Sequence, residues 1–239
     1  MSENVKPVKG DAVLLEYTII DKATARVLET TTEQVAKDAG LYSEETKYGP
    51  RLVILGSGEL PSGLEEQLVD VGEGEEREIE LPPEKAFGRR DPEKIRVIPA
   101  REFSARGIIP RAGMEVEVRG ERGTVISVGS GRVIVDFNHP LAGRELVFKV
   151  KVVKVLKSAK EKTEALFKKY VTIDGASLNF ENGTAVITIP FNALFSPENL
   201  EALNAFARSV ESYVSDIKAV KLVSTILERN PEEAGAGTR

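Results

Sequence analysis

Residues 132–153, RVIVDFNHPLAGRELVFKVKVV, contain two runs in which apolar and polar side chains alternate. Residues 133–137 predict one half-buried strand and residues 146–152 predict another, because successive side chains of a strand point to opposite faces. Residues 138–140, Asn-His-Pro, cannot continue a strand ladder, since Pro140 has no backbone N–H and holds the residue before it extended. We therefore expect the two strands to be separated by a turn at a sheet edge or at a domain junction.

Composition excludes several classes of protein. The 239 residues leave room for one large domain or for two to three small ones. The net charge of −5 comes from intermixed acidic and basic residues, so we expect no nucleic-acid partner. Without cysteine, and with a single histidine, the chain has no disulfide, no thiol nucleophile and no cysteine or histidine cluster for a metal. We predict neither a metal site nor a cofactor.

Targeting signals are not apparent in the sequence. The N-terminal residues lack the apolar segment of a signal peptide, and no apolar run approaches the roughly 18 residues of a membrane span. We therefore expect a cytoplasmic protein without a membrane partner. High charge and only two glutamines are typical of thermophile proteins.

The first part of the chain predicts a sheet with short helices. Strand patterns occupy residues 12–20, 26–31, 51–55 and 76–81. A short surface helix is expected over residues 32–40, with Thr32 as N-cap and Gly40 after its end. A second is expected over residues 61–69, where Leu64 and Leu68 share a face.

A compact all-β unit follows, with strands expected over residues 94–99, 114–118, 123–128 and 132–137 and a helical turn over residues 100–103. We interpret this unit as an insertion, because the strand after Leu141 belongs with the earlier sheet.

The last part shows a separate pattern. Residues 157–170 predict a linker helix, and Asn182-Gly183 predicts a hairpin turn between strands over residues 177–180 and 184–189. A long helix begins at Pro197 with Ser196 as N-cap, and a strand follows over residues 219–227. One apolar stripe runs along the helix through Leu200, Leu203, Phe206, Val210, Tyr213, Val214 and Ile217. The tail over residues 228–239 is expected to be disordered.

Several motifs in order resemble the FKBP-type peptidyl-prolyl isomerases, specifically the SlyD-like and long archaeal forms. The similarity covers residues 11–155. Its motifs are Leu60-Pro61-Ser62-Gly63-Leu64-Glu65, Ala86-Phe87-Gly88, Asn138-His139-Pro140-Leu141-Ala142-Gly143 and Leu146-Val147-Phe148, together with Tyr17 and Glu29 at the positions of a pocket tyrosine and aspartate.

The resemblance implies an α+β fold in which an antiparallel sheet wraps on a short helix. The implied isomerase domain is discontinuous, over residues 1–90 and 137–157. Residues 91–136 would be a chaperone domain inserted in the flap, and residues 158–239 a C-terminal ββαβ-like domain that includes the linker helix.

The resemblance also implies a pocket for proline, lined by Tyr17, Leu28, Glu29, Leu60, Pro61, Leu64, Phe87, Leu141 and Phe148. Leu64 or Phe148 would lie beneath the proline ring. The alternative is that these are ordinary core residues, as aromatic and aliphatic residues on strands usually are.

Three positions depart from the family pattern. Glu29 replaces an aspartate, Phe87 replaces a tyrosine and so lacks a hydroxyl donor, and Leu64 stands where some members have tryptophan. We expect weaker ligand binding rather than lost catalysis. His139 is interpreted as a structural hydrogen-bonding residue, with a catalytic or metal-binding role as the alternative.

The resemblance predicts an enzyme that isomerises Xaa-Pro bonds in unfolded or proline-containing polypeptides. The alternative is an ATP-independent holdase chaperone with a weak or inactive pocket. Several apolar residues of the insert either bind unfolded chains or form its core, namely Ile98, Phe103, Ile108, Ile109, Met114 and Val116. The C-terminal helix stripe suggests a homodimer, with a second client-binding surface as the rival.

Overall fold

The computed structural model describes residues 5–226 and shows an α+β chain with three separate sheets. The predicted fold class is confirmed. The predicted disordered tail lies outside the described residues. Within residues 5–226, no helix combines the length and apolar character needed to cross a membrane.

The first sheet is antiparallel, in the order β2-β1-β9-β4, with β3 also paired to β1. Its strands are β1 (Ala12–Asp21), β2 (Val27–Thr30), β3 (Arg51–Ile54), β4 (Glu76–Leu81) and β9 (Leu146–Leu156). The helix α2 (Ser62–Leu68) turns Leu64 and Leu68 into the core on one face of this sheet, as their spacing predicts.

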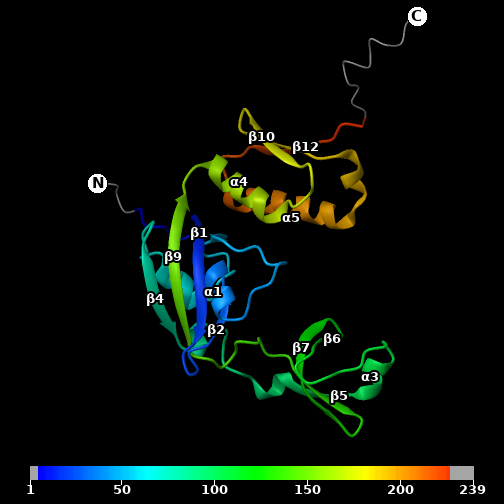
Figure 1. Cartoon of the computed structure of the whole chain (residues 1–239). Helices are drawn as coiled ribbons and strands as arrows, with labels where there is room; N and C mark the ends of the chain where they lie inside the picture. The colour runs from blue at the N-terminus through cyan, green and yellow to red at the C-terminus, as the bar shows by residue number, and fades with distance from the viewer. Residues whose placement is uncertain (1–4, 227–239) are drawn as a thin grey trace, which may run out of the picture.

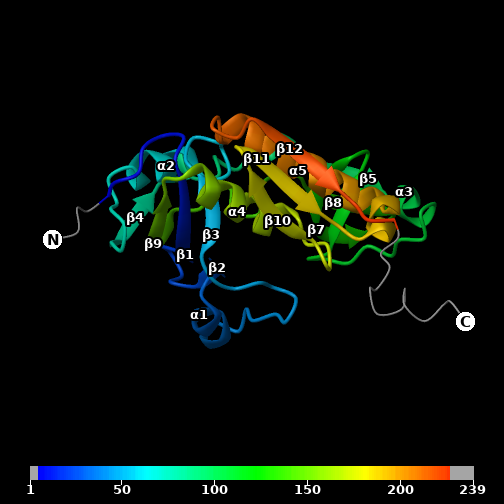
Figure 2. The ribbon, with the colours of Figure 1, turned by 90° about the horizontal axis from the view of Figure 1, so that it is seen from above.

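Between β2 and β3 the chain leaves the sheet. The helix α1 (Glu33–Asp38) and the loop after it project away from the sheet in Figure 2. Gly40 ends this helix with a positive φ of 69°, as predicted, but the Thr32 side chain makes no capping hydrogen bond.

The strands on either side of Asn138-His139-Pro140 belong to different sheets, so the predicted junction is confirmed. The strand β8 (Arg132–Asp136) pairs in the second sheet, whereas β9 pairs with β1 and β4 in the first. A strand late in the sequence therefore completes the first sheet, as the sequence predicts.

The insert has its own sheet and its own core. Its strands follow the order β5-β8-β7-β6. Their bounds are Ile95–Pro99 for β5, Glu115–Val118 for β6 and Glu121–Gly129 for β7, with α3 over Ala100–Ser104 and short 3-10 turns over Pro83–Lys85 and Pro92–Lys94 before them. The buried side chains that form this core are Ile98, Phe103, Val116, Val118, Val125, Val133 and Val135.

The C-terminal unit has three strands in the order β10-β11-β12. They are β10 (Ser177–Glu181), β11 (Thr184–Thr188) and β12 (Ala219–Val223), with α4 over Ala159–Tyr170, α5 over Pro197–Tyr213 and a 3-10 turn over Phe191–Phe195. The hairpin turn at Asn182-Gly183 and the Ser196 cap of α5 are both as predicted. β12 pairs with β11 in parallel.

The helix over residues 157–170 is not a spacer, which corrects its interpretation as a linker. Leu166 of α4 is buried, and Phe167 packs edge to face on Phe206 of α5 at 5.9 Å between ring centroids. Leu52, Ile54 and Leu156 of the first sheet belong to the same apolar core. The C-terminal unit is thereby packed directly on the first sheet.

Figure 1 shows the resulting arrangement. The C-terminal unit lies beyond one end of the long strands β1 and β9, and the insert lies beyond the other end.

Candidate functional site

Most of the predicted pocket residues lie in one cluster. Tyr17, Leu64 and Phe148 are buried members of the core of the first sheet. Four others are half-buried against this core, namely Leu28, Leu60, Phe87 and Leu141. Pro61 immediately precedes α2 and is half-buried, but it is not among the described members of the cluster.

The cluster has a floor and walls. Leu64 and Phe148 are 0% and 1% exposed, so they form a closed floor without free surface. Phe87 and Leu141 are half-buried, as are Leu28 and Leu60, so each of these side chains keeps some exposed surface. The half-buried side chains therefore form walls over this closed floor.

A polar triangle borders the apolar cluster. The Tyr17 hydroxyl donates to Oε1 of Glu29 at 2.7 Å and accepts from Nη1 of Arg51 at 2.8 Å. Arg51 also donates to Glu29 at 3.1 Å. Strand register explains the triangle: Leu15 is opposite Arg51, Ile19 is opposite Glu29, and both share a face of β1 with Tyr17.

Burial and the neighbouring Glu29 carboxylate raise the pKa of Tyr17 above its usual value. Its hydroxyl therefore keeps its proton throughout the neutral range and remains a hydrogen-bond donor. Arg51 was not among the predicted site residues. The only sequence signal for it is a lone charge at the start of an apolar strand.

His139 organises one wall. Its ring stacks on Phe87, with 4.2 Å between centroids and 2° between planes. Its Nδ1 accepts a hydrogen bond from the Leu141 N–H at 3.1 Å, as expected of a structural hydrogen-bonding residue. Burial lowers the pKa of His139, although the charge of Glu29 opposes this shift. The neutral imidazole thus holds two predicted wall residues together.

Among the described residues, no group of three or more His, Asp or Glu side chains is placed to hold a metal ion.

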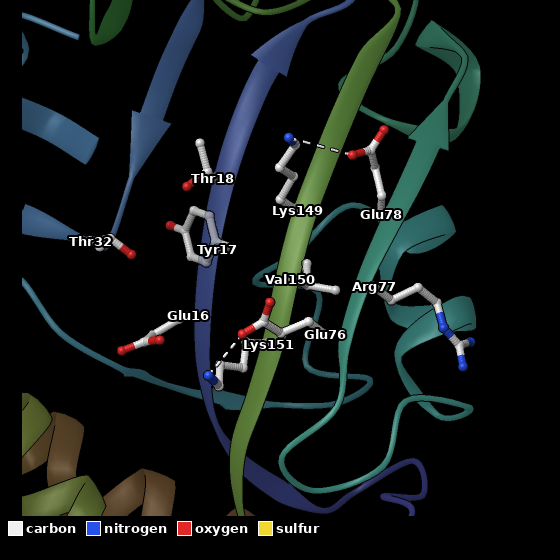
Figure 3. A pocket seen from close by; sticks show the side chains of 10 residues that line it. All are labelled: Glu16, Tyr17, Thr18, Thr32, Glu76, Arg77, Glu78, Lys149, Val150 and Lys151. Carbon is white, nitrogen blue, oxygen red and sulfur yellow. Dashed lines mark hydrogen bonds and ion pairs between the residues drawn. The ribbon is translucent and has the colours of Figure 1, made fainter. Parts of the chain in front are cut away.

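A hollow of about 350 Å³ lies against the strands β1, β4 and β9 (Figure 3). Two cross-strand ion pairs line it, Lys149 with Glu78 at 3.6 Å and Lys151 with Glu76 at 2.8 Å. Of the predicted pocket residues, its described lining includes Tyr17 alone. Most of its charged groups are already paired and its lining is largely polar, so we do not assign the isomerase pocket to it.

A larger cleft of about 950 Å³ lies between the segment leading into β3 and the helix α4. Tyr17 and Leu60 of the predicted pocket are among its lining residues. The cleft and the apolar cluster therefore share these two residues and lie next to each other.

Comparisons with known proteins show what the chain is similar to. A protein-family model described as FKBP26, IF domain, matches residues 96–141. A short-type peptidyl-prolyl cis-trans isomerase of Methanocaldococcus jannaschii is 39% identical over 144 residues, which cover 60% of this chain and 90% of that relative. The FKBP-type isomerase SlyD of Aeromonas hydrophila is 35% identical, over 59% of this chain and 60% of that relative.

A probable FKBP-type 16 kDa isomerase of Pseudomonas fluorescens is 32% identical, over 44% of this chain and 73% of that relative. A solved structure of the three FKBP domains of wheat FKBP73 covers 64% of this chain and 42% of that chain at 14% identity, but its TM-score of 0.34 is too low to support a common overall fold.

The chain combines an antiparallel sheet packed on the short helix α2 with an apolar cluster that has a tyrosine and a carboxylate at its edge. The chain belongs to the FKBP-type peptidyl-prolyl cis-trans isomerases.

Proposed function

We propose that this protein catalyses cis-trans isomerisation of Xaa-Pro bonds in polypeptides at the cluster around Tyr17, Phe87 and Leu141. The observation that carries this proposal is a set of half-buried apolar walls over a fully buried apolar floor, with hydrogen-bonding groups on one edge. Family membership supports the same reaction.

The chemistry needs neither a nucleophile nor a metal. Resonance in the planar amide sets a barrier of about 18–20 kcal/mol, and the twisted transition state has lost that resonance. A carbonyl without amide resonance is less dipolar, so an apolar site destabilises the planar form more than the twisted form. Each ~1.4 kcal/mol of this difference accelerates the reaction about tenfold.

Exchange NMR on a short Xaa-Pro peptide tests this function directly. We expect catalytic amounts of protein to accelerate cis-trans exchange, and the variant Phe87→Ala to lose most of that acceleration while remaining folded. Phe191→Ala is the matched control, because Phe191 lies in the C-terminal unit and is also partly exposed. A wild-type protein that does not accelerate exchange would exclude the proposed enzyme.

We also propose that the insert binds unfolded segments of client proteins. The six apolar residues considered in the sequence divide into two groups. Ile98, Phe103 and Val116 are buried in the core of the insert, and Ile108 packs against it. Ile109 is 75% exposed, and Met114 is also exposed.

Further apolar side chains of the insert face solvent. Val97 on β5 is 57% exposed, and Ile126 and Val128 on β7 are exposed as well. An unpaired apolar surface of this kind favours binding of extended or unfolded chains. This surface supports the chaperone role and keeps the holdase alternative open.

Replacing Val97 and Ile109 by serine tests the capture role. We expect the double variant to isomerise short peptides at the wild-type rate but to catalyse proline-limited refolding of a protein less efficiently. Leu41→Ser, at an exposed position outside the insert, is the control. If the wild type prevents aggregation without accelerating any proline isomerisation, the holdase function replaces the enzyme.

A cytoplasmic location, the absence of a nucleic-acid partner and the homodimer stay predictions from the sequence.

A further inference from the structure

The cleft of about 950 Å³ between the first sheet and the C-terminal unit has two walls of different origin. One wall is the segment from Thr46 to Val53, which leads into β3 and includes Tyr48 and Arg51. The other wall is α4, which contributes Ala165 and Lys168.

The two walls are held in place by packing. Leu52 and Leu156 of the sheet share one apolar core with Leu166 of α4. The Lys169 ammonium on α4 donates to both oxygens of Glu59, at 2.6 and 2.8 Å, and to the Leu52 carbonyl at 3.4 Å. These contacts hold the two walls of the cleft against each other.

The cleft is continuous with the isomerase pocket. Tyr17 belongs to the buried core of the pocket and also lines the cleft, as does Leu60 from the pocket wall. Arg51, which donates to the Tyr17 hydroxyl, lines the cleft as well. A chain that places its proline on Phe87 and Leu141 can thus continue past Tyr17 into the cleft.

We propose that the cleft binds the extended segment that flanks the proline of a client chain, so that α4 is part of the substrate-binding surface. This inference rests on the proposed isomerase function. It assigns the C-terminal unit a direct role in substrate selection.

The lining of the cleft defines the chemistry of that segment. Its apolar part includes Leu14, Leu52, Leu60 and Leu156. Its charged part has five basic side chains, Lys47, Arg51, Lys154, Lys168 and Lys169, against three acidic ones, Glu59, Glu161 and Glu164.

Most of these charges are already paired. Lys169 pairs with Glu59, Lys154 with Glu161 and Arg51 with Glu29. Within residues 5–226, no ion pair involves Lys47 or Lys168. A flanking segment that alternates apolar and acidic side chains therefore fits the cleft.

Three peptides test this inference. The first is a tetrapeptide Ala-Ala-Pro-Phe, and the other two carry an apolar-acidic extension of about six residues, roughly 20 Å when extended, on its N-terminal or its C-terminal side. We expect one of the extended peptides to show a KM about fivefold lower, with kcat unchanged, because the extension binds the ground state and the transition state equally. The gain should shrink at high salt.

Variants locate the effect. The double variant Lys47→Glu/Lys168→Glu should abolish the gain without changing the rate on the tetrapeptide. The matched control is Arg208→Glu/Lys221→Glu, whose exposed side chains lie on the C-terminal unit outside the described lining of the cleft. Ala165→Trp should also abolish the gain by filling the cleft without a change of charge.

The outcomes separate this inference from the function on which it rests. If the wild type does not accelerate exchange in the tetrapeptide, the isomerase function is wrong. If the tetrapeptide is isomerised but neither extension lowers KM, the cleft is not a substrate site. The same conclusion holds if the gain survives in both Lys47→Glu/Lys168→Glu and Ala165→Trp.

Discussion

At the scale of single residues, Tyr17 joins the apolar pocket to its polar edge. Its ring is buried in the core, and its hydroxyl is held between Glu29 and Arg51. The side chain of Glu29 is longer than the aspartate of the family pattern, and its carboxylate accepts a hydrogen bond within the protein. A ligand that approaches this edge meets a prearranged donor and acceptor network.

Replacing Tyr17 by phenylalanine keeps the apolar wall and removes the hydroxyl. We expect the free energy of unfolding to fall by about 0.5–1.5 kcal/mol, because Glu29 and Arg51 each lose a partner but keep each other. Chemical denaturation measures this loss. Tyr42→Phe, at an exposed position, is the control and should leave stability unchanged. Equal stability of the two variants would mean that the triangle contributes nothing to the fold.

His139 makes the wall of the pocket sensitive to pH. Protonation turns Nδ1 from an acceptor into a donor, so it breaks the hydrogen bond from the Leu141 N–H. The folded pKa is lowered from an ordinary value of 6.5, so as pH falls the unfolded chain takes up this proton before the folded protein does. The contribution of His139 to stability is thus complete above pH 6.5 and is lost as pH falls through the lower folded pKa.

We expect isomerase activity to decline over the same pH range, below about pH 6.5. The variant His139→Gln should not show this decline. A pH profile of kcat/KM from exchange NMR measures both proteins, with circular dichroism at each pH to confirm that they are folded. Parallel profiles would assign the decline to another group.

The fully buried floor behaves differently from the walls. Phe148 is 1% exposed, so Phe148→Ala should leave a cavity and lower the free energy of unfolding by about 3–5 kcal/mol. Denaturant titration tests this value. Phe87→Ala removes the same atoms from a half-buried position and should cost clearly less. If both variants unfold at the same denaturant concentration, the division into floor and walls is wrong.

At the scale of elements, Asn138 ties together the two chain segments that connect the insert to the first sheet. Its Oδ1 accepts from the Asp91 N–H and its Nδ2 donates to the Asp91 carbonyl, both at 2.9 Å. Arg90 pairs with Asp136 at 2.6 Å beside it. This clasp limits how freely the insert can swing relative to the pocket.

Replacing Asn138 by alanine should release the clasp. We expect faster amide exchange at Asp91 and at position 138. We also expect less efficient refolding of protein clients, with unchanged turnover of short peptides. Asn204→Ala, on the exposed side of α5, is the control. Unchanged amide exchange at Asp91 would show that other contacts hold the insert.

The predicted homodimer was based on the apolar stripe of α5, and much of this stripe is buried within the chain itself. Leu203, Phe206, Val210 and Val214 of its apolar stripe are buried in the chain's own core. Leu200 and Tyr213 of the same stripe are exposed, and so are Phe195 and, on the strand β12, Leu222 and Val223. A homodimer through the C-terminal domain stays a prediction.

At the scale of the whole molecule, the three sheets do not correspond to three independent units. The insert has a separate core, whereas the first sheet and the C-terminal unit share one. Lys157 also pairs with the largely buried Asp11 at 2.7 Å, which holds the start of the C-terminal unit against β1.

Truncation after residue 157 should therefore destabilise the isomerase sheet, because it exposes Ala12, Leu52, Ile54 and Leu156 to water. Deletion of the insert should not have this effect. Differential scanning calorimetry of both truncated proteins measures the difference. A chain ending at residue 157 that melts at the wild-type temperature would contradict the shared core.

The sequence by itself determined the order and type of nearly every element. Period-two alternation, Asn182-Gly183, the Ser196-Pro197 start of α5 and the interruption at residues 138–140 are local signals, and local backbone chemistry is enough to read them. Most of the residues named from the family motifs also lie together in one apolar cluster of the structure.

Only the tertiary structure decided two further points: that Arg51 joins Tyr17 and Glu29 at the edge of the apolar cluster, and that α4 packs on the first sheet. Each depends on contacts between segments far apart in the chain, such as the register of β1 with β3. Hydrophobicity reports that a side chain will be buried but not against which partner, because apolar burial has no direction.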